Sequence, residues 1–259
     1  MMEVIYVDAH NIQQLKGKQA PSVMALGYFD GVHLGHQQVI ETAKQQAAEQ
    51  QLSTAILSFF PHPKSVIQKG GAVHYLEPLE DRIEKLAQLG VDYYYVVKFD
   101  EAFSKIEAHD FIEGYVLALG AQHIVCGFDY HYGRKASGNH ATLQAYTQQG
   151  IAVTIVDEAQ KNGEKISSTM IRQCVASGNV AAVPKFLGNY YYTKYCTKRG
   201  VADYYMLPPV GRYKAQVEMA CKAVVEAHIA VGENRELYFE RSIQQKQPVK
   251  IMWLEKIHE

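Results

Sequence analysis

Between residues 22 and 156 the chain alternates short apolar runs with amphipathic stretches, and this alternation limits the possible folds more than any other feature. Strands alternating with helices predict a parallel sheet covered by helices on both faces, the doubly wound α/β class. The apolar runs of strand length occupy 23–27, 54–60, 93–99, 123–127 and 151–156. The helical patterns occupy 35–50, 78–90, a stretch that starts between 104 and 108 and ends at 120, and 141–149.

The pattern changes after Gly188, where the long helical stretches end. Two adjacent prolines then interrupt the chain, and apolar residues alternate with polar ones from Tyr213 to Met219. Alternation with a period of two is typical of strands buried on one face. We therefore predict two domains: an α/β domain over residues 1–188 and a small, mostly antiparallel, barrel-like β module over residues 189–259.

Composition limits the function classes. The chain has 26 basic and 27 acidic side chains and a formal net charge of −1, so it lacks the basic character of a nucleic-acid binder. Residues 1–17 have neither the basic start nor the apolar core of a signal peptide, and no apolar run reaches the roughly 18 residues of a membrane span. The four cysteines form no CxxC pair and are typical of reduced thiols. We expect a cytoplasmic protein that binds neither nucleic acid nor membranes.

The stretch MALGYFDGVHLGHQ places His33 and His36 where the first predicted strand passes into the first predicted helix. In a doubly wound sheet, ligands bind at this carboxyl end of the strands. A helix start offers unpaired N–H groups and partial positive charge to an anion. Gly31 and Gly35 leave room for phosphate oxygens, and the imidazoles add donors whose charge can increase beside a polyphosphate. The stretch predicts a phosphate site, although two exposed histidines at a helix cap also fit it.

The stretch KISSTMIRQCVASG predicts a second anion site. Ser167 or Ser168 is expected to cap a short helix and, with Thr169, to surround the free amides of its first turn. Arg172 lies about one turn into that helix and can fold back over the same phosphates. Taken alone, an ordinary capped helix with a surface arginine explains the stretch equally well. Just before it, Asn162-Gly163 predicts a β-hairpin. Together, the two anion sites predict a clamp on a nucleoside triphosphate.

Four motifs occur along the chain: GYFDGVHLGH at 27–36, FFPHP at 59–63, GFDYHYGRKASG at 127–138 and ISSTMIR at 166–172. In this order they resemble the prokaryotic riboflavin kinase/FAD synthetase family, and specifically its FMN adenylyltransferase domain. The H-x-G-H pattern is shared across the wider nucleotidyltransferase group, so the set of four carries the specificity. The resemblance covers roughly residues 1–188 and implies a Rossmann-like nucleotidyltransferase domain.

The resemblance implies the reaction FMN + MgATP → FAD + pyrophosphate, in which the FMN phosphate attacks the α-phosphorus of ATP. No protein nucleophile is needed, so catalysis consists of positioning and charge stabilisation. His33 and His36 are then expected to contact the ATP phosphates, and Arg172 to hold the leaving pyrophosphate. Asp129 is expected to orient the FMN phosphate or the metal, because an acid needs Mg²⁺ or a polar bridge to act on a phosphate. The expected ATP-binding residues are Gly27, Phe29, Asp30, Gly31, His33, Gly35, His36, Ser167, Ser168, Thr169 and Arg172.

A flavin pocket is expected around the prolines of the second motif and the aromatic residues of the third. Rigid prolines and aromatic faces suit a planar ring system. His62, between two prolines, either belongs to this pocket or only fills the bend. The expected flavin-binding residues are Pro61, His62, Pro63, Phe128, Asp129 and Tyr132.

The C-terminal part departs from the family. A working riboflavin kinase carries a Gly-x-Pro-Thr-Ala-Asn segment that binds Mg-nucleotide, and none of the eight prolines here is followed by threonine. The stretch MLPPVGRYKAQVE does resemble the family's next strand. The family's catalytic glutamate falls near Tyr238, with Glu236 and Glu240 as displaced versions of it. We expect a truncated, degenerate kinase module and an FMN adenylyltransferase without riboflavin kinase activity.

Two other functions stay open. One is a bifunctional riboflavin kinase/FMN adenylyltransferase with a divergent kinase site. The other is a non-catalytic flavin or nucleotide sensor, which would have no need of a pyrophosphate clamp.

Overall fold

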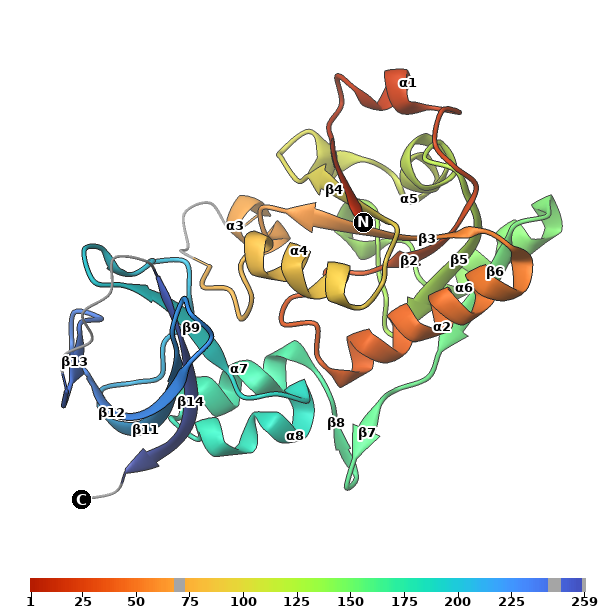
Figure 1. Ribbon diagram of the computed structural model, residues 1–259. Helices are drawn as coiled ribbons and strands as arrows, with labels where there is room; N and C mark the ends of the chain where they lie inside the picture. Colours follow the sequence, from red (N-terminus) through yellow and green to blue (C-terminus); the bar gives the residue numbers. More distant parts are fainter. Residues whose placement is uncertain (68–72, 242–247, 258–259) are drawn as a thin grey trace. The chain divides into compact units, whose positions relative to one another are not determined.

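The computed structural model describes residues 1–67, 73–241 and 248–257 (Figure 1). The chain divides into two compact units. Unit 1 comprises Met1–Val73 and Leu79–Ala159, and unit 2 comprises His74–Pro78 and Gln160–Glu259. No helix among the described residues is long and apolar enough to cross a membrane.

Unit 1 is built on a parallel sheet, which has six strands within the described ranges, in the order β1-β4-β3-β2-β5-β6. The chain moves outward from β2 through β3 to β4 and then returns to β5 on the other side of β2. The strand order therefore reverses between β2 and β5. The strands are β1 (Glu3–Val7), β2 (Ser22–Leu26), β3 (Ser53–Phe60), β4 (Tyr93–Lys98), β5 (Ala121–Gly127) and β6 (Ala152–Val156).

Helices cover both faces of this sheet, because its strands are apolar on both faces. In β2, Val23 and Ala25 pack against α2 (Leu34–Gln50) and α4 (Leu79–Gln88). The alternate residues Met24 and Leu26 face the helices of the opposite layer. That layer contains α5 (Ala108–Phe111), its π-helical continuation Ile112–Leu117, α6 (His140–Gln144) and the 3₁₀ helix Ala145–Gln149. Shorter helices are α1 (Ile12–Leu15), α3 (Pro63–Ile67) and the 3₁₀ turns Phe103–Lys105 and Arg134–Ala136. The predicted doubly wound α/β class is confirmed.

The sequence pattern did not predict β1. This strand is at the edge of the sheet and pairs with β4 alone. Among its five residues, Val7 is the one that is fully buried, so no clear period marks it as a strand.

The longer segment of unit 2 begins with a hairpin of β7 (Gln160–Lys161) and β8 (Glu164–Lys165). Its turn residues Asn162 and Gly163 have φ values of 53° and 77°, as the predicted Asn-Gly turn requires. The helices α7 (Ser168–Ala176) and α8 (Pro184–Leu187) follow, joined by a 3₁₀ turn at Val180–Ala182.

The rest of unit 2 is an antiparallel sheet that curls into a barrel-like module, as predicted (Figure 1). Within the described ranges, the strand order is β10-β9-β14-β11-β12-β13. The strands are β9 (Tyr192–Cys196), β10 (Gly200–Val201), β11 (Gly211–Glu218), β12 (Val224–Val231), β13 (Leu237–Phe239) and β14 (Val249–Ile257).

A short segment from the middle of the chain joins this module. The amide of Tyr75 donates to the carbonyl of Tyr204 at 2.7 Å, and the amide of Met206 donates to the carbonyl of Tyr75 at 3.0 Å. Unit 2 is therefore discontinuous in sequence. The domain boundary after Gly188 stays a prediction.

The core of unit 2 contains a buried polar pair. Trp253, the chain's single tryptophan, has no exposed surface, and its Nε1–H donates to Oγ1 of the equally buried Thr193 at 3.2 Å. Removing this acceptor without changing the shape leaves a buried indole N–H without its partner.

Thr193→Val is therefore expected to lower the free energy of unfolding by about 1–3 kcal/mol. In a Trp253→Phe background the same substitution should cost much less, because the donor is gone. Urea unfolding followed by far-UV circular dichroism measures both differences. Equal costs in the two backgrounds would show that the hydrogen bond contributes nothing to stability.

Candidate active site

The loop after β2 lies at the point where the strand order reverses. Leu26, the last residue of β2, pairs with Cys126 near the end of β5. The loops that follow these two strands therefore start side by side at the carboxyl edge of the sheet, where doubly wound folds bind ligands. We call residues 27–36 the histidine loop.

His33 is the N-cap of α2. Its Nδ1 accepts a hydrogen bond from the amide of His36 at 3.2 Å, which replaces the usual serine or aspartate cap. Because Nδ1 is the acceptor, the proton of the neutral ring lies on Nε2. The His33 and His36 rings stack with centroids 3.6 Å apart and planes 15° apart.

Both histidines are neutral in the free protein. Burial, followed by the charge of Lys85, lowers the pKa of His33 to about 4, although Asp30 and Asp129 act in the opposite direction. Burial and the charges of His33, Arg82 and Lys85 lower the pKa of His36 well below its usual value. Nδ1 of His36 is buried without a hydrogen-bond partner among the described residues.

The histidine loop holds two non-glycine residues in left-handed backbone conformations. Phe29 has a φ of 55° and Val32 a φ of 39°, and both side chains are buried. Such conformations cost about 1–3 kcal/mol each and cluster at functional sites. The surrounding structure must hold the loop in this shape.

Two cations of α4, which the sequence analysis missed, contact this loop. The Arg82 guanidinium has no exposed surface; its Nη1 donates to the carbonyl of Tyr28 at 3.0 Å, and Nη2 lies 3.8 Å from a carboxylate oxygen of the buried Asp30. Nζ of Lys85 donates to the carbonyl of Gly31 at 2.8 Å. Both partners are 54 positions earlier in the chain, so no local pattern indicates these contacts.

Two glycines make room for the side chains of the loop itself. A Cβ at Gly27 would lie 2.8 Å from the Phe29 ring. A Cβ at Gly35 would lie 3.3 Å from two atoms of the His33 ring and 3.3 Å from Cβ of Ala159. The missing side chain at Gly35 thus accommodates the imidazole, and close approach of a phosphate there stays a prediction.

The loop after β5 contains the third motif. The amide of Phe128, the first residue after β5, donates to the carbonyl of Val156 at 2.9 Å. Asp129 is exposed and close enough to His33 for its charge to act on that ring. Tyr132, by contrast, is 5% exposed, and its hydroxyl is 2.8 Å from Oγ1 of Thr142. In this structure the Tyr132 ring is part of the core, and its role in flavin binding stays a prediction.

The second motif forms a turn after β3, with a cis peptide bond between Phe60 and Pro61. Nδ1 of His62 accepts a hydrogen bond from the amide of Lys64 at 3.0 Å. The His62 ring also meets the Tyr28 ring edge-on, with centroids 4.3 Å apart. His62 therefore shapes the bend and contacts the histidine loop. The flavin assignment of Pro61, His62 and Pro63 is not decided by these contacts.

The fourth motif belongs to unit 2. Ser167 is the predicted N-cap of α7, and its hydroxyl accepts from the amide of Met170 at 3.2 Å. Ser168 and Thr169 form the first turn of that helix. Nη1 of Arg172 donates to the carbonyl of His74 at 2.6 Å. The structure thus brings together the first three motifs in unit 1, and the serines and Arg172 in unit 2.

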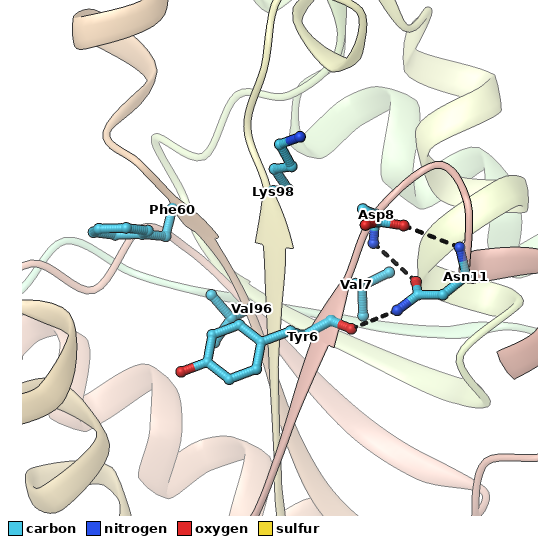
Figure 2. A pocket seen from close by; sticks show the side chains of 7 residues that line it. All are labelled: Tyr6, Val7, Asp8, Asn11, Phe60, Val96 and Lys98. Atoms are coloured by element: carbon cyan, nitrogen blue, oxygen red, sulfur yellow. Dashed lines mark hydrogen bonds between the residues drawn. The ribbon is translucent and has the colours of Figure 1, made fainter.

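A hollow of about 230 Å³ lies at the carboxyl ends of β1, β3 and β4 (Figure 2). Tyr6 and Phe60, which are 59% and 37% exposed, lie on two sides of it. The carboxylate of Asp8 accepts hydrogen bonds from the amides of His10 and Asn11, which lower its pKa. None of the predicted site residues lines this hollow.

The two glutamates expected near a former kinase site have local partners in unit 2. A carboxylate oxygen of Glu240 lies 2.8 Å from Nδ1 of His228, and one of Glu236 accepts from the amide of Asn234 at 3.1 Å. Tyr238, between them, is exposed. These contacts do not decide whether either glutamate has a catalytic role.

Comparison with known proteins identifies the relatives of the chain. The FAD synthetase family profile matches residues 15–170. A bifunctional riboflavin kinase/FMN adenylyltransferase of Listeria monocytogenes is 42% identical over 228 residues, which are 82% of this chain and 72% of the relative. An FAD synthetase of the same species is 32% identical over 200 residues, 74% of this chain and 80% of the relative.

A crystal structure described as a macrolide-efflux protein from Streptococcus pneumoniae is also similar. It superimposes with a TM-score of 0.88 and 28% identity, covering 100% of this chain and 92% of that one. The family profile and the named relatives identify the chain as a nucleotidyltransferase, and its histidine loop lies where the strand order reverses. The family profile matches more than half of the residues, and the chain belongs to the FAD synthetase family.

The neutral His33 predicts a loss of stability in acid. Its pKa of about 4 in the folded protein is below the unfolded value of 6.5, so the unfolded state binds more protons between these limits. Its contribution is complete above pH 6.5 and is lost as the pH falls toward 4, by up to about 3 kcal/mol. His33→Asn keeps a capping side chain and removes the titrating group. Urea unfolding at pH 7 and about pH 5 should show a smaller acid loss for this variant. The exposed-site control His10→Asn should lose as much stability in acid as wild type. If His33→Asn loses this same amount, the assignment is contradicted.

The contact at Gly35 predicts that alanine substitutions at two helical glycines, Gly35 and Gly114, have different effects on stability. Gly114, in the π-helical stretch, has open space where a Cβ would lie, so Gly114→Ala should raise stability by about 0.5–1 kcal/mol. Gly35→Ala should lack this gain, because the new methyl group displaces the His33 ring. Thermal unfolding measures the change in stability of each variant, and the NMR chemical shift of the His33 ring in Gly35→Ala measures the displacement of that ring. If Gly35→Ala gained as much stability as Gly114→Ala and left the His33 resonance unmoved, the contact between residue 35 and the His33 ring would be unimportant.

Proposed function

We propose that the protein is an FMN adenylyltransferase, which transfers AMP from MgATP to the phosphate of FMN. A phosphate oxygen of FMN forms a bond to the α-phosphorus of ATP, the bond from that phosphorus to the β-phosphate oxygen breaks, and pyrophosphate leaves. The products are FAD and pyrophosphate. Membership of the FAD synthetase family and the names of both Listeria relatives support this proposal.

The observation that carries the proposal is the pair of stacked, neutral imidazoles at the start of α2. The reaction needs donors that strengthen their contact as charge develops on the phosphates. His33 presents an Nε2–H at a helix start, whose free amides and partial positive charge attract anions. A bound polyphosphate opposes the effect of burial on both pKa values, so the histidines can gain a proton when the nucleotide binds.

The remaining roles are assigned by chemistry. The residues Gly27, Phe29, Asp30, Gly31 and Gly35 shape the ATP-binding loop. Ser167, Ser168 and Thr169 are assigned to the leaving pyrophosphate by their hydroxyls and helix-start amides, and Arg172 by its planar fork. Its bond to the His74 carbonyl would then have to be exchanged for one to phosphate.

Mg²⁺ fits this site when a single protein carboxylate holds it together with the substrate phosphates. The described residues contain no cluster of three or more acidic, histidine or cysteine side chains suited to a metal. Mg²⁺ usually needs one or two carboxylates, keeps several waters and takes its other ligands from substrate phosphates. The exposed carboxylate of Asp129 would supply the protein ligand. When bound, Mg²⁺ would neutralise charge on the transferring phosphates.

For the flavin, we propose Pro61, His62, Pro63, Phe128 and Tyr132 as the surrounding residues, with Asp129 at the FMN phosphate. The buried Tyr132 ring would contribute through the shape of the pocket.

We further propose that riboflavin kinase activity is absent. The missing Pro-Thr segment supports this view. The 42% identical relative is named as bifunctional, so a bifunctional enzyme with a divergent kinase site is the second candidate. A non-catalytic sensor is disfavoured, since it does not require a pyrophosphate-binding element.

The purified protein with MgATP is expected to convert FMN to FAD, and to form neither FMN nor FAD from riboflavin; chromatography of the flavins measures both. His36→Ala should lower kcat about a hundredfold, since loss of one transition-state donor costs about 3 kcal/mol. The exposed His10 supplies the matched control His10→Ala, which should keep wild-type activity. FMN formed from riboflavin would establish the bifunctional alternative, and the absence of FAD from FMN would refute the proposed function.

A further inference from the structure

We infer that Arg82 and Lys85 are positioning residues for adenylyl transfer, and that they act by fixing the peptide groups of the histidine loop. This inference rests on the proposed function for its effect on catalysis. It concerns two side chains of α4, a helix outside the four sequence motifs.

The two cations contact the loop at separate points. They are three positions apart on α4 and therefore lie on one face of the helix. Arg82 holds the carbonyl of Tyr28 at 3.0 Å, and Lys85 holds the carbonyl of Gly31 at 2.8 Å. Ser58 of β3 joins the first contact, because its hydroxyl donates to the same Tyr28 carbonyl at 2.8 Å.

These contacts determine where the adjacent N–H groups point. In a planar trans peptide, the C=O and the following N–H point in opposite directions. The carbonyls turned toward α4 therefore turn the amides of Phe29 and Val32 away from it. The Val32 amide donates within the loop, to the Phe29 carbonyl at 3.3 Å. A loop that binds an anion needs this polarity, with its carbonyl oxygens held away from the phosphates.

The same two peptides precede the two left-handed residues of the loop. Phe29 follows the peptide held by Arg82, and Val32 follows the peptide held by Lys85. A β-branched residue such as Val32 rarely adopts a positive φ, so this conformation persists only if neighbouring groups impose it. The cations of α4 are placed to do so.

The cations also set the electrostatic surroundings of the histidines. The charged or titratable groups that act on His33 are Lys85, Asp30 and Asp129, and those that act on His36 are His33, Arg82 and Lys85. Lys85 acts on both rings and lowers both pKa values. Its removal should therefore be detected at both histidines in the absence of substrate.

The test uses Lys85→Met, which keeps most of the apolar stem and removes the ammonium group. Its matched control is Lys44→Met on α2, because the Lys44 ammonium is paired with Glu41 and not with the histidine loop. Arg82→Lys keeps the charge but replaces the fork that serves both Tyr28 and Asp30. Far-UV circular dichroism verifies that each variant folds.

Two readouts are measured on each variant. NMR titration of the histidine rings without substrate gives the pKa values of His33 and His36, with the resonances assigned from His33→Asn and His36→Ala. Steady-state kinetics give kcat and KM for ATP as a function of pH.

For Lys85→Met we expect both histidine pKa values to rise and kcat to fall by about ten- to a hundredfold, with a smaller change in KM. Arg82→Lys should lower kcat with a smaller effect on the two pKa values, which separates geometry from charge. Lys44→Met should match wild type. Unchanged histidine titrations and an unchanged kcat in folded Lys85→Met would overturn the inference. A wild-type protein that makes no FAD would instead refute the proposed function, and the titrations would then still decide whether the cations fix the loop.

Discussion

The buried guanidinium of Arg82 ties the histidine loop to the rest of unit 1. A charge without exposed surface costs several kcal/mol unless acceptors surround it. Its acceptors include the Tyr28 carbonyl and the buried Asp30 carboxylate, both in the loop after β2, and Oγ of Ser58 in β3. Removing either member of the Arg82–Asp30 pair would leave a buried charge that has lost its counter-ion. The contact spans 54 positions, so the loop acquires its shape only when the sheet and α4 are both in place.

The parts of the fold that were predictable from sequence depend on local chemistry. The apolar runs of β2 to β6 predicted strand positions to within a few residues. In β2 to β5 the signal is strong because helices bury most of each strand on both faces. Ser167 caps α7 through its own side chain, and Asn162-Gly163 turns the hairpin. Each of these signals acts over two or three residues, and tertiary packing does not override them.

The unpredicted parts depend on contacts that are distant in sequence. Arg82 and Lys85 resemble the ordinary charged face of an amphipathic helix, and only the folded structure shows carbonyl oxygens in front of them. His74–Pro78 joins unit 2 through backbone bonds, which leave no side-chain pattern. Tyr132 was assigned to a flavin pocket because an aromatic face suits a planar ring system, and this assignment stays a prediction. The motif did not indicate that the Tyr132 hydroxyl meets Thr142 and that its ring packs in the core. A motif gives the residue type at a site, whereas the direction of the side chain is determined by packing.

The stacked imidazoles limit how the site can carry charge. With centroids 3.6 Å apart, two protonated rings would repel each other by about 5 kcal/mol at the effective dielectric constant of a protein site. The pair therefore titrates as a coupled unit that accepts one proton much more readily than two. In His33, protonation of Nδ1 would also break the cap on the His36 amide, so acid that protonates His33 also removes the side-chain cap of α2. The cap thus keeps the neutral His33 as a fixed Nε2–H donor, and the pair as a whole can take up one positive charge beside a bound phosphate.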